Sequence, residues 1–212
     1  MSRARRRIAA AQAGFDTFAE AAASRLAEAG HPLACAKGCA FCCHSLVSLM
    51  PAEAFRLARH IDRMPGGAAL KTRITQHADR HGKKDGTARL SERLACPCLD
   101  PETKLCRVHP ARPLTCRGMN SVDRGACSQS LARPDAEIPV PSALALHRRV
   151  QKLYDAEAAA TPDQSANAVE LSQALALIWA EPHAEARWEA GEDVFAACRT
   201  QDISATPVPS FA

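Results

Sequence analysis

Cysteine clustering is the feature that most limits what this chain of 212 residues can fold into. Four of its ten cysteines fall within nine residues, and four more, at positions 96, 98, 106 and 116, follow in a segment rich in turn residues. Thiolates are strong ligands for zinc and for iron–sulfur clusters. The sequence therefore predicts a metal site assembled from two distant segments. Its candidate ligands are Cys35, Cys39, Cys42, Cys43, Cys96, Cys106 and Cys116.

The spacing within the first run matters because metal ligands must converge. In a helix or a tight turn, residues three or four apart share one face, so Cys35, Cys39 and either Cys42 or Cys43 can converge. Adjacent side chains point in different directions, so Cys42 and Cys43 do not readily bind the same ion. The seven candidates exceed the four thiolates that one zinc ion or one 4Fe–4S cluster requires. Either two centres exist, or some thiols have other roles.

Packing and disulfide formation are the alternative roles for these cysteines. A free cysteine often packs as a small hydrophobe, which suits the isolated Cys198 and leaves Cys98 and Cys127 open. A disulfide framework needs an oxidising compartment. The basic N-terminus is not followed by an apolar signal region, and no apolar stretch reaches the roughly 18–20 residues of a membrane span. We therefore expect a cytoplasmic protein with reduced thiols and no membrane partner.

Basic side chains lie close to the cysteines in sequence. Arg112 and Arg117 flank Cys116, and a guanidinium group stabilises the negative charge of an all-thiolate site. Both arginines are therefore candidate cofactor-binding residues, with ordinary surface ion pairing as the alternative. His44 and His109 are secondary candidates for metal ligation, with an exposed structural histidine as the simpler interpretation of each.

Hydrophobic periodicity predicts a mostly helical fold with one small β-hairpin. Apolar residues recur at three- and four-residue steps, as is typical of helices, in residues 2–29, 51–64, 68–81, 142–157, 166–180 and 185–198. Residues 94–99 and 105–108 flank a turn and predict a hairpin that carries Cys96, Cys98 and Cys106. Residues 82–92 and 120–141 are expected to be loops, because glycine, proline and polar residues dominate them.

We expect four segments along the chain. Residues 1–30 form an N-terminal amphipathic helix, and residues 31–120 form a cysteine-cluster metal-binding core. Residues 121–203 supply helices that pack on this core, and residues 204–212 form a flexible tail. Aromatic residues make up only 4% of the chain, so small side chains must build the core, and a metal could add to its stability.

Net charge gives little support for a nucleic-acid partner. The formal value is +4, whereas nucleic-acid binding usually needs a concentrated basic surface. The one dense basic run comprises Arg3, Arg5, Arg6 and Arg7, which is expected to be a solvated helix end. We therefore do not expect a nucleic-acid partner, and the sequence does not identify a protein partner.

Three stretches give the chain a resemblance to a known bacterial family. They are Cys35-x3-Cys39-x2-Cys42-Cys43, the pair Cys96-Pro97-Cys98-Leu99-Asp100 and Cys106-Arg107-Val108-His109, and Arg112-Pro113-Leu114-Thr115-Cys116-Arg117. With these, the chain resembles the YkgJ-type cysteine-cluster proteins, whose CxxCxxCC domain is named for chelation of zinc or iron. The first spacing here is three residues, against two in that name. The resemblance implies a zinc or iron cofactor, including an iron–sulfur cluster.

Three functions are compatible with these features. The first is a metal-binding protein without catalysis, favoured by the surplus of thiols and by the lack of motifs such as Gly-x-Ser-x-Gly or His-Glu-x-x-His. The second is a cluster-dependent enzyme, either a redox protein or a group-transfer enzyme. The resemblance extends to flagellin lysine N-methylases, which are associated with an iron–sulfur centre, so methyl transfer rests on analogy. The third is a zinc-stabilised module that binds nucleic acid or protein.

Overall fold

The computed structural model describes residues 2–136, 138–161 and 168–200. The α-helices are α1 (Arg3–Glu28), α2 (Pro51–Arg63), α3 (Gly67–His81), α4 (Gly86–Ser91), α5 (Leu114–Gly118), α6 (Arg124–Ala132), α7 (Leu144–Ala159), α8 (Leu171–Ala180) and α9 (Ala184–Glu189). Short 3-10 helices are η1 (Phe41–His44), η2 (His109–Ala111), η3 (Pro134–Ala136) and η5 (Ala196–Cys198). Strands β1 (Ser48–Leu49) and β2 (Val169–Glu170) pair antiparallel. The prediction of a mostly helical fold is confirmed.

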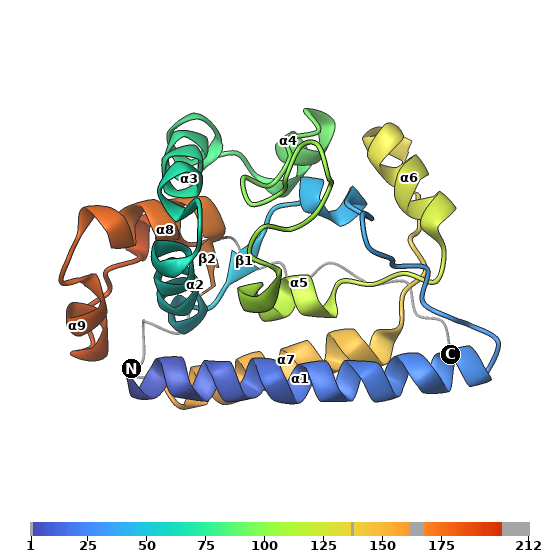
Figure 1. Ribbon diagram of the computed structural model, residues 1–212, viewed down its shortest axis with the longest axis horizontal. Coiled ribbons are helices and arrows are strands. Elements are labelled where there is room, and N and C mark those ends of the chain that lie inside the picture. Colours follow the sequence, from blue (N-terminus) through green and yellow to red (C-terminus); the bar gives the residue numbers. More distant parts are fainter. Residues whose placement is uncertain (1, 137, 162–167, 201–212) are drawn as a thin grey trace.

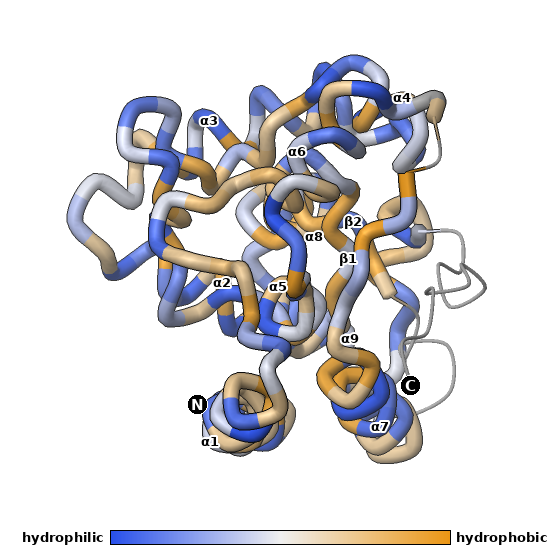
Figure 2. Tube along the Cα trace, turned by 90° about the vertical axis from the view of Figure 1, so that its right-hand side faces the viewer, coloured by the Kyte–Doolittle hydropathy of each residue, from blue (hydrophilic) through white to orange (hydrophobic). Residues whose placement is uncertain are grey.

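The helices form two packed groups with α5 between them. Helices α1 and α7 contact one another and run along one side of the molecule (Figure 1). Figure 2 shows the same two helices end-on. Helices α2, α3 and α8 pack together as the second group, with the β1–β2 pair beside them. Helix α5 contacts α1, α7 and β1. It therefore holds its one cysteine, Cys116, in the middle of the fold.

Helix α1 follows the predicted period closely. Ser2 caps its N-terminus by accepting a hydrogen bond from the backbone N–H of Arg5, 3.3 Å away. Ile8, Phe15 and Ala22 recur every seven residues and are buried. The basic run at its start is occupied by ion pairs, because Arg5 contacts Glu185 at 2.6 Å and Arg7 contacts Glu157 at 2.9 Å.

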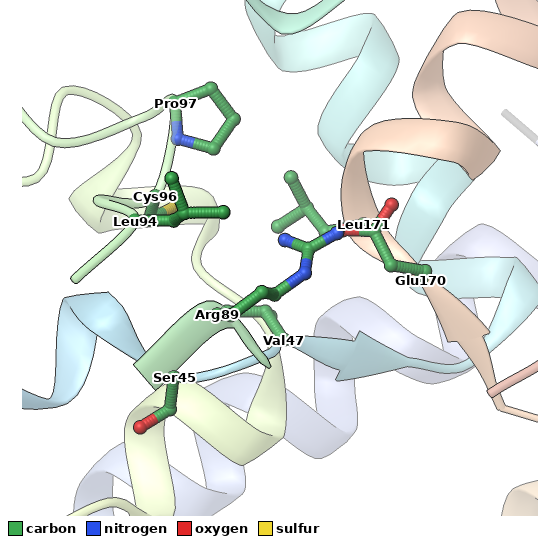
Figure 3. Close-up of a pocket in the computed structure, with 8 residues that line it drawn as sticks. All are labelled: Ser45, Val47, Arg89, Leu94, Cys96, Pro97, Glu170 and Leu171. Atoms are coloured by element: carbon green, nitrogen blue, oxygen red, sulfur yellow. The ribbon is translucent and has the colours of Figure 1, made fainter. Parts of the chain in front are cut away.

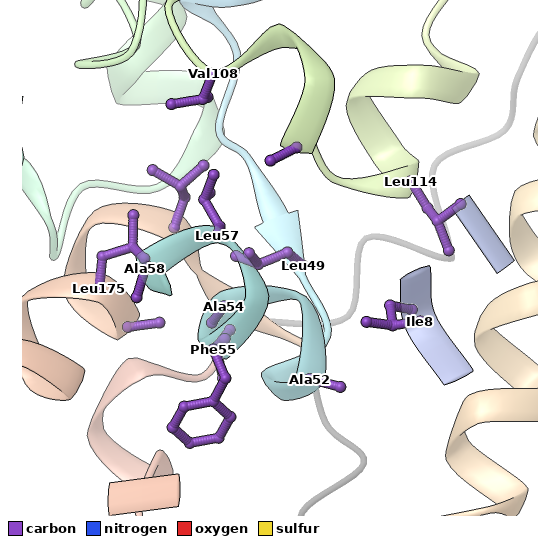
Figure 4. Packing of buried hydrophobic residues seen from close by; sticks show 14 of the residues in the cluster. Ile8, Leu49, Ala52, Ala54, Phe55, Leu57, Ala58, Val108, Leu114 and Leu175 are labelled. Carbon is purple, nitrogen blue, oxygen red and sulfur yellow. The ribbon is translucent and has the colours of Figure 1, made fainter. Parts of the chain in front are cut away.

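The core lies around α2 and is built largely from small and aliphatic side chains. Figure 4 shows Leu49, Ala54 and Leu57 packed together, with Leu175 of α8 beside them, and all four are fully buried. Three of the aromatic rings gather at one edge of the core, where Phe55 lies 5.4 Å from both Trp188 and Phe195 between ring centroids. None of the described helices combines the length and the apolarity needed to cross a bilayer.

Several predicted elements differ from the observed ones. The hairpin is reduced to one isolated bridge between Leu99 and Cys106, and the two-stranded sheet joins residues 48–49 to 169–170 instead. The segments expected to be loops each contain a short helix, α4 and α6. Both are capped by an aspartate, since Asp85 accepts a hydrogen bond from Ala88 and Asp123 accepts one from Ala126.

The C-terminal predictions also need correction. The single helix expected over residues 185–198 is divided into α9 and η5, and Gly191 between them has a φ of +91°, which cannot continue a helix. The helix expected over residues 166–180 starts only at residue 171, after β2, and residues 166–167 lie outside the described part. The predicted tail over residues 204–212 also lies outside the described residues.

Close packing of α5 on α7 predicts a marked effect of Gly118→Ala. A Cβ at Gly118 would meet Cγ2 of Val150 at 2.4 Å, so one of the two helices must shift. We expect the free energy of unfolding to fall by about 1–3 kcal/mol, the usual cost of overpacking. Denaturant unfolding of the purified protein measures this change.

Gly14→Ala is the matched control for this substitution. Gly14 is exposed within α1, and nothing lies within 4 Å of the added methyl group. Because alanine favours a helix over glycine, this variant should gain about 0.5–1 kcal/mol. An unchanged stability of Gly118→Ala would show that α5 can move away from α7 at little cost.

Candidate metal centre

The first cysteine run forms a turn followed by a 3-10 helix. Gly38 has a φ of +83°, a conformation that favours glycine, and the N–H of Cys39 bonds to the carbonyl of Ala36 at 2.9 Å. Cys42 and Cys43 follow in η1, and their side chains are hydrogen-bonded to each other. The two neighbouring thiols therefore lie together, although adjacent side chains were expected to diverge.

Backbone contacts bring the second cysteine segment against the first. The N–H of Cys96 donates to the carbonyl of Cys43 at 2.7 Å, which joins residues 53 positions apart. The Cys96 and Cys98 thiols are hydrogen-bonded to each other. The N–H of Arg107 bonds to the carbonyl of Cys98 at 2.9 Å, next to the Leu99–Cys106 bridge. Cys96, Cys98 and Cys106 are thus held beside η1.

Helix α5 supplies the third cysteine-bearing segment. Its first N–H, on Leu114, donates to the Glu53 carboxylate at 2.7 Å, and the Thr115 hydroxyl donates to the carbonyl of Ser48 at 2.8 Å. Cys116 therefore sits on a short helix fixed at its start by α2 and β1. Ionised thiols at positions 42, 96 and 106 would all raise the pKa of Cys116, after the larger effect of burial. These thiols consequently face a common region.

We refer to six cysteines of this region as the inner thiols. They are Cys42, Cys43, Cys96, Cys98, Cys106 and Cys116. Burial and mutual repulsion raise the pKa of Cys106 and Cys116, whereas the hydrogen bond from Cys98 lowers the pKa of Cys96. The pKa of Cys96 is therefore shifted in the opposite direction to those of Cys106 and Cys116. A bound cation would relieve the repulsion among the others.

Arginines lie at two edges of the inner thiols. Arg112 opposes the effect of burial on the pKa of Cys106, and Arg73 adds a smaller lowering effect on Cys96. Arg73 was missed by the sequence analysis, because it lies in α3 and reaches the site only through the fold, where it donates to the carbonyl of Leu99 at 2.5 Å.

The Arg117 guanidinium is engaged by other partners. Its Nε donates to the carbonyl of Arg112 and its Nη2 to the carbonyl of Pro110, both at 2.8 Å. Its Nη1 forms an ion pair with Asp16 of α1. The side chain thus ties the turn before α5 to α1. Of the two arginines predicted to bind a cofactor, Arg112 has the more direct position.

The two candidate histidines lie in different surroundings. Nδ1 of His44 is 3.2 Å from the carbonyl of Ala40 and 3.3 Å from that of Phe41. Such backbone contacts commonly orient a metal-binding histidine, and they leave Nε2 as the available ligand atom if Nδ1 carries the proton. His109 lies at the surface beside Arg112. Partial desolvation of its ring, together with the charge of that arginine, lowers its pKa.

The remaining cysteines lie at the margin of the inner thiols, next to Cys42, or away from them. Cys35 and Cys39 are neighbours of Cys127, a residue whose role the sequence left open. Cys198 is buried near Glu170 and away from these groups, and burial raises its pKa to about 11. Cys98, whose role the sequence also left open, lies among the inner thiols and is 1% exposed. The short apolar run around Cys98 was the only signal that it would be buried.

The space beside Cys96 is small. Figure 3 shows Arg89 reaching from α4 toward Glu170, with Leu94, Cys96 and Pro97 on the other side. The cavity among them has a volume of about 10 Å³, which is close to the minimum for one water molecule. A larger depression of about 480 Å³ is lined by Lys83, Lys84 and Cys198, and none of the inner thiols lines it.

The donor set fits a thiophilic metal, although the thiols are not yet arranged around one. Among the described residues, no three His, Cys, Asp or Glu side chains already stand as a metal-binding group. Soft thiolate donors select zinc, iron–sulfur clusters or monovalent copper over magnesium or calcium. Three segments that are separate in sequence bring thiols to one region, and most of these thiols are half-buried. The residues present therefore suit zinc or an iron–sulfur cluster.

Comparison with known families agrees with this chemistry. Residues 34–136 match the family model of the CxxCxxCC domain, described as a "Putative zinc- or iron-chelating domain". The matched segment begins just before Cys35 and ends after α6, so it contains every cysteine except Cys198. Searches of curated proteins and of solved structures give no match.

Proposed function

We propose that the protein is a metal-binding protein that chelates zinc or iron through its clustered cysteines, on the premise that residues 34–136 match the CxxCxxCC family model. The proposed ligands come from Cys35, Cys39, Cys42, Cys43, Cys96, Cys106 and Cys116, to which the fold adds Cys98 and Cys127. The observation that carries the proposal is the 2.7 Å hydrogen bond from Cys96 to Cys43, because it joins two cysteine segments that are remote in sequence.

The fold supports a role for the metal as a cross-link. The cysteine segments contain turns, 3-10 helix and one isolated bridge, which bury little apolar area of their own. Metal binding to thiolates contributes directly to folding free energy, so a bound ion would stabilise this part of the molecule. Arg112 and Arg73 lie where they would offset the negative charge of several thiolates. We retain the predicted N-terminal helix, metal-binding core and C-terminal helices as part of this proposal, with the core extended to include Cys127.

The structure favours metal binding over a nucleic-acid module. Arg5 and Arg7, two of the four arginines in the basic run, are paired with Glu185 and Glu157. Pairing within the chain lowers the positive potential that phosphate binding requires.

Anaerobic purification followed by metal analysis and a visible spectrum tests the proposal. Iron with acid-labile sulfide and a broad visible absorption would identify an iron–sulfur cluster. A colourless protein with tightly bound zinc would identify a zinc site. Either result supports chelation through these cysteines. Protein that remains metal-free when supplied with zinc and with iron and sulfide would contradict the proposal.

A further inference from the structure

Three of the four cysteines outside the inner thiols form a group at the surface, whereas Cys198 is buried elsewhere. Cys35, Cys39 and Cys127, which we call the outer thiols, come from the loop before η1 and from α6. Cys35 is exposed, and Cys39 and Cys127 are half-buried. Each of the three pairs is close enough for a charge on one thiol to affect the other. They therefore occupy one surface region.

Ser121 holds two of the outer thiols in place. The Cys35 sulfur is 3.9 Å from the carbonyl oxygen of Ser121, and the N–H of Ala34 donates to the same oxygen at 2.8 Å. The Cys127 thiol is hydrogen-bonded to the Ser121 side chain. The Ser121 hydroxyl is itself fixed by the carbonyl of Pro141, 2.7 Å away. One anchored residue thus sets the position of thiols 92 residues apart.

Helix α6 is also packed directly against η1. The Arg124 guanidinium lies 5.8 Å from the centre of the Phe41 ring, a cation–π distance, and Figure 1 shows α6 beside the segment that contains η1. Asp123 caps α6 through Ala126, which fixes where the helix begins. Cys127, one turn into α6, is therefore held near the loop that carries Cys39.

The number of thiols allows two sites. Cys42 lies between the groups, since it interacts with Cys96 on one side and with Cys35 and Cys127 on the other. Without Cys42, the inner region still holds five thiols, which exceeds the four that one zinc ion or one 4Fe–4S cluster needs. These are Cys43, Cys96, Cys98, Cys106 and Cys116. Cys42 is thus available to complete a second set of four.

We propose that Cys35, Cys39 and Cys127 form a second metal site, with Cys42 as its fourth ligand, and that this outer site holds an exchangeable zinc or ferrous ion. The inference rests on the proposed function and extends it from one centre to two. The loop before η1 can close on an ion with little loss of packing, because residues 35–37 are exposed. The outer ion is reached by solvent and exchanges faster than the inner one.

Titration of the metal-free full chain with zinc, and with cobalt as an absorbing probe, tests the proposal. The reduced wild-type protein should bind one equivalent of metal tightly at the inner site and one further equivalent at the outer site. A chelator should remove the outer equivalent first. Cys127→Ser should lose it while the tightly held equivalent remains. Cys39→Ser should likewise lose only the weakly held equivalent. Cys106→Ser should instead lose the tightly held equivalent. Cys198→Ser is the control and should bind as much metal as the wild type. Thermal unfolding of each variant confirms that it is folded.

The outcomes separate this inference from the proposed function. If the chain binds a tight equivalent that depends on Cys106, and Cys127→Ser binds as much metal as the wild type, the outer site is wrong and the inner site stands. If Cys127→Ser loses all metal, the two groups act as one centre and the inference is also wrong. Failure of the wild-type chain to bind any metal would contradict the proposed function itself.

Discussion

Replacing Cys116 with serine is expected to remove the tightly held metal and to lower the thermal midpoint by about 8–16 °C. A ligand present at about 1,000 times its dissociation constant adds about 4 kcal/mol to the stability of the folded state. In a chain of this size each kcal/mol corresponds to about 2–4 °C in the midpoint. Metal analysis of the purified variant and a thermal scan, both without oxygen, measure the two effects.

The position of Cys116 is the reason for choosing it. It lies on α5, whose start is fixed by the hydrogen bond from Leu114 to Glu53 and whose packing leaves no room for a Cβ on Gly118. A ligand on such a rigid element cannot easily be replaced by a neighbour. Serine is nearly the same size as cysteine, so the metal-free fold should change little, and the expected loss comes from the missing thiolate.

Chelator treatment and Cys198→Ser provide the controls. A strong chelator should bring the wild-type midpoint down to that of chelator-treated Cys116→Ser, and it should lower the midpoint of the variant by much less. Cys198 is equally a free cysteine and is 4% exposed, but it lies away from the inner thiols, so its replacement should leave metal content unaltered. If Cys116→Ser retained its metal and its midpoint, Cys116 would not be a ligand.

The long amphipathic helices could be predicted because their signals are local. The apolar period, the N-cap Ser2 and the Pro51 start place α1 and α2 within one or two residues of their observed bounds. Helix α6 was missed although Asp123 is a good N-cap, because the surrounding glycine and prolines suggested a loop. The β1–β2 pair could not be predicted, since residues 48–49 meet residues 169–170 only through the packing of α2 on α8.

The candidate site could be predicted in composition but not in arrangement. Sequence spacing identified the cysteine segments, and the hydrogen bond from Cys96 to Cys43 agrees with two segments meeting. Spacing alone could not separate Cys35 and Cys39 from Cys42, because all three lie within eight residues. The division depends on α6, which brings Cys127 to the loop, and on Ser121 in the segment before that helix. Arg73 and Arg112 likewise reach the thiols from different elements, which no local pattern reveals.

Glu53 is the buried group on which the second large effect depends. It lies on α2 and is 1% exposed, and four donors surround its carboxylate. They are Gln12 Nε2 at 2.8 Å, the N–H of Met50 at 3.1 Å, the N–H of Leu114 at 2.7 Å and the Tyr154 hydroxyl at 3.0 Å. Burial raises the pKa of Glu53, although each of these hydrogen bonds lowers it. One side chain thus connects α1, α2, α5 and α7.

Glu53→Ala is expected to lower the free energy of unfolding by about 4 kcal/mol or more. Each buried donor left without an acceptor costs about 1–3 kcal/mol, and four donors lose their partner together. Glu53→Gln keeps the shape but turns one acceptor into a donor that faces two others, so it should cost about 1–3 kcal/mol. Denaturant unfolding measures both variants, with Glu20→Ala on the exposed face of α1 as the control.

The same substitution should also weaken the metal site, because Glu53 fixes the N–H that begins α5. With Leu114 released, Cys116 loses its fixed position, and a chelator should remove the tightly held metal faster from Glu53→Ala than from the wild type. Glu20→Ala should behave as the wild type in this assay. A stability loss below about 1 kcal/mol would mean that water replaces the carboxylate as an acceptor for these four donors. In that case the position of α5 would depend on its contacts with α7 and β1 instead.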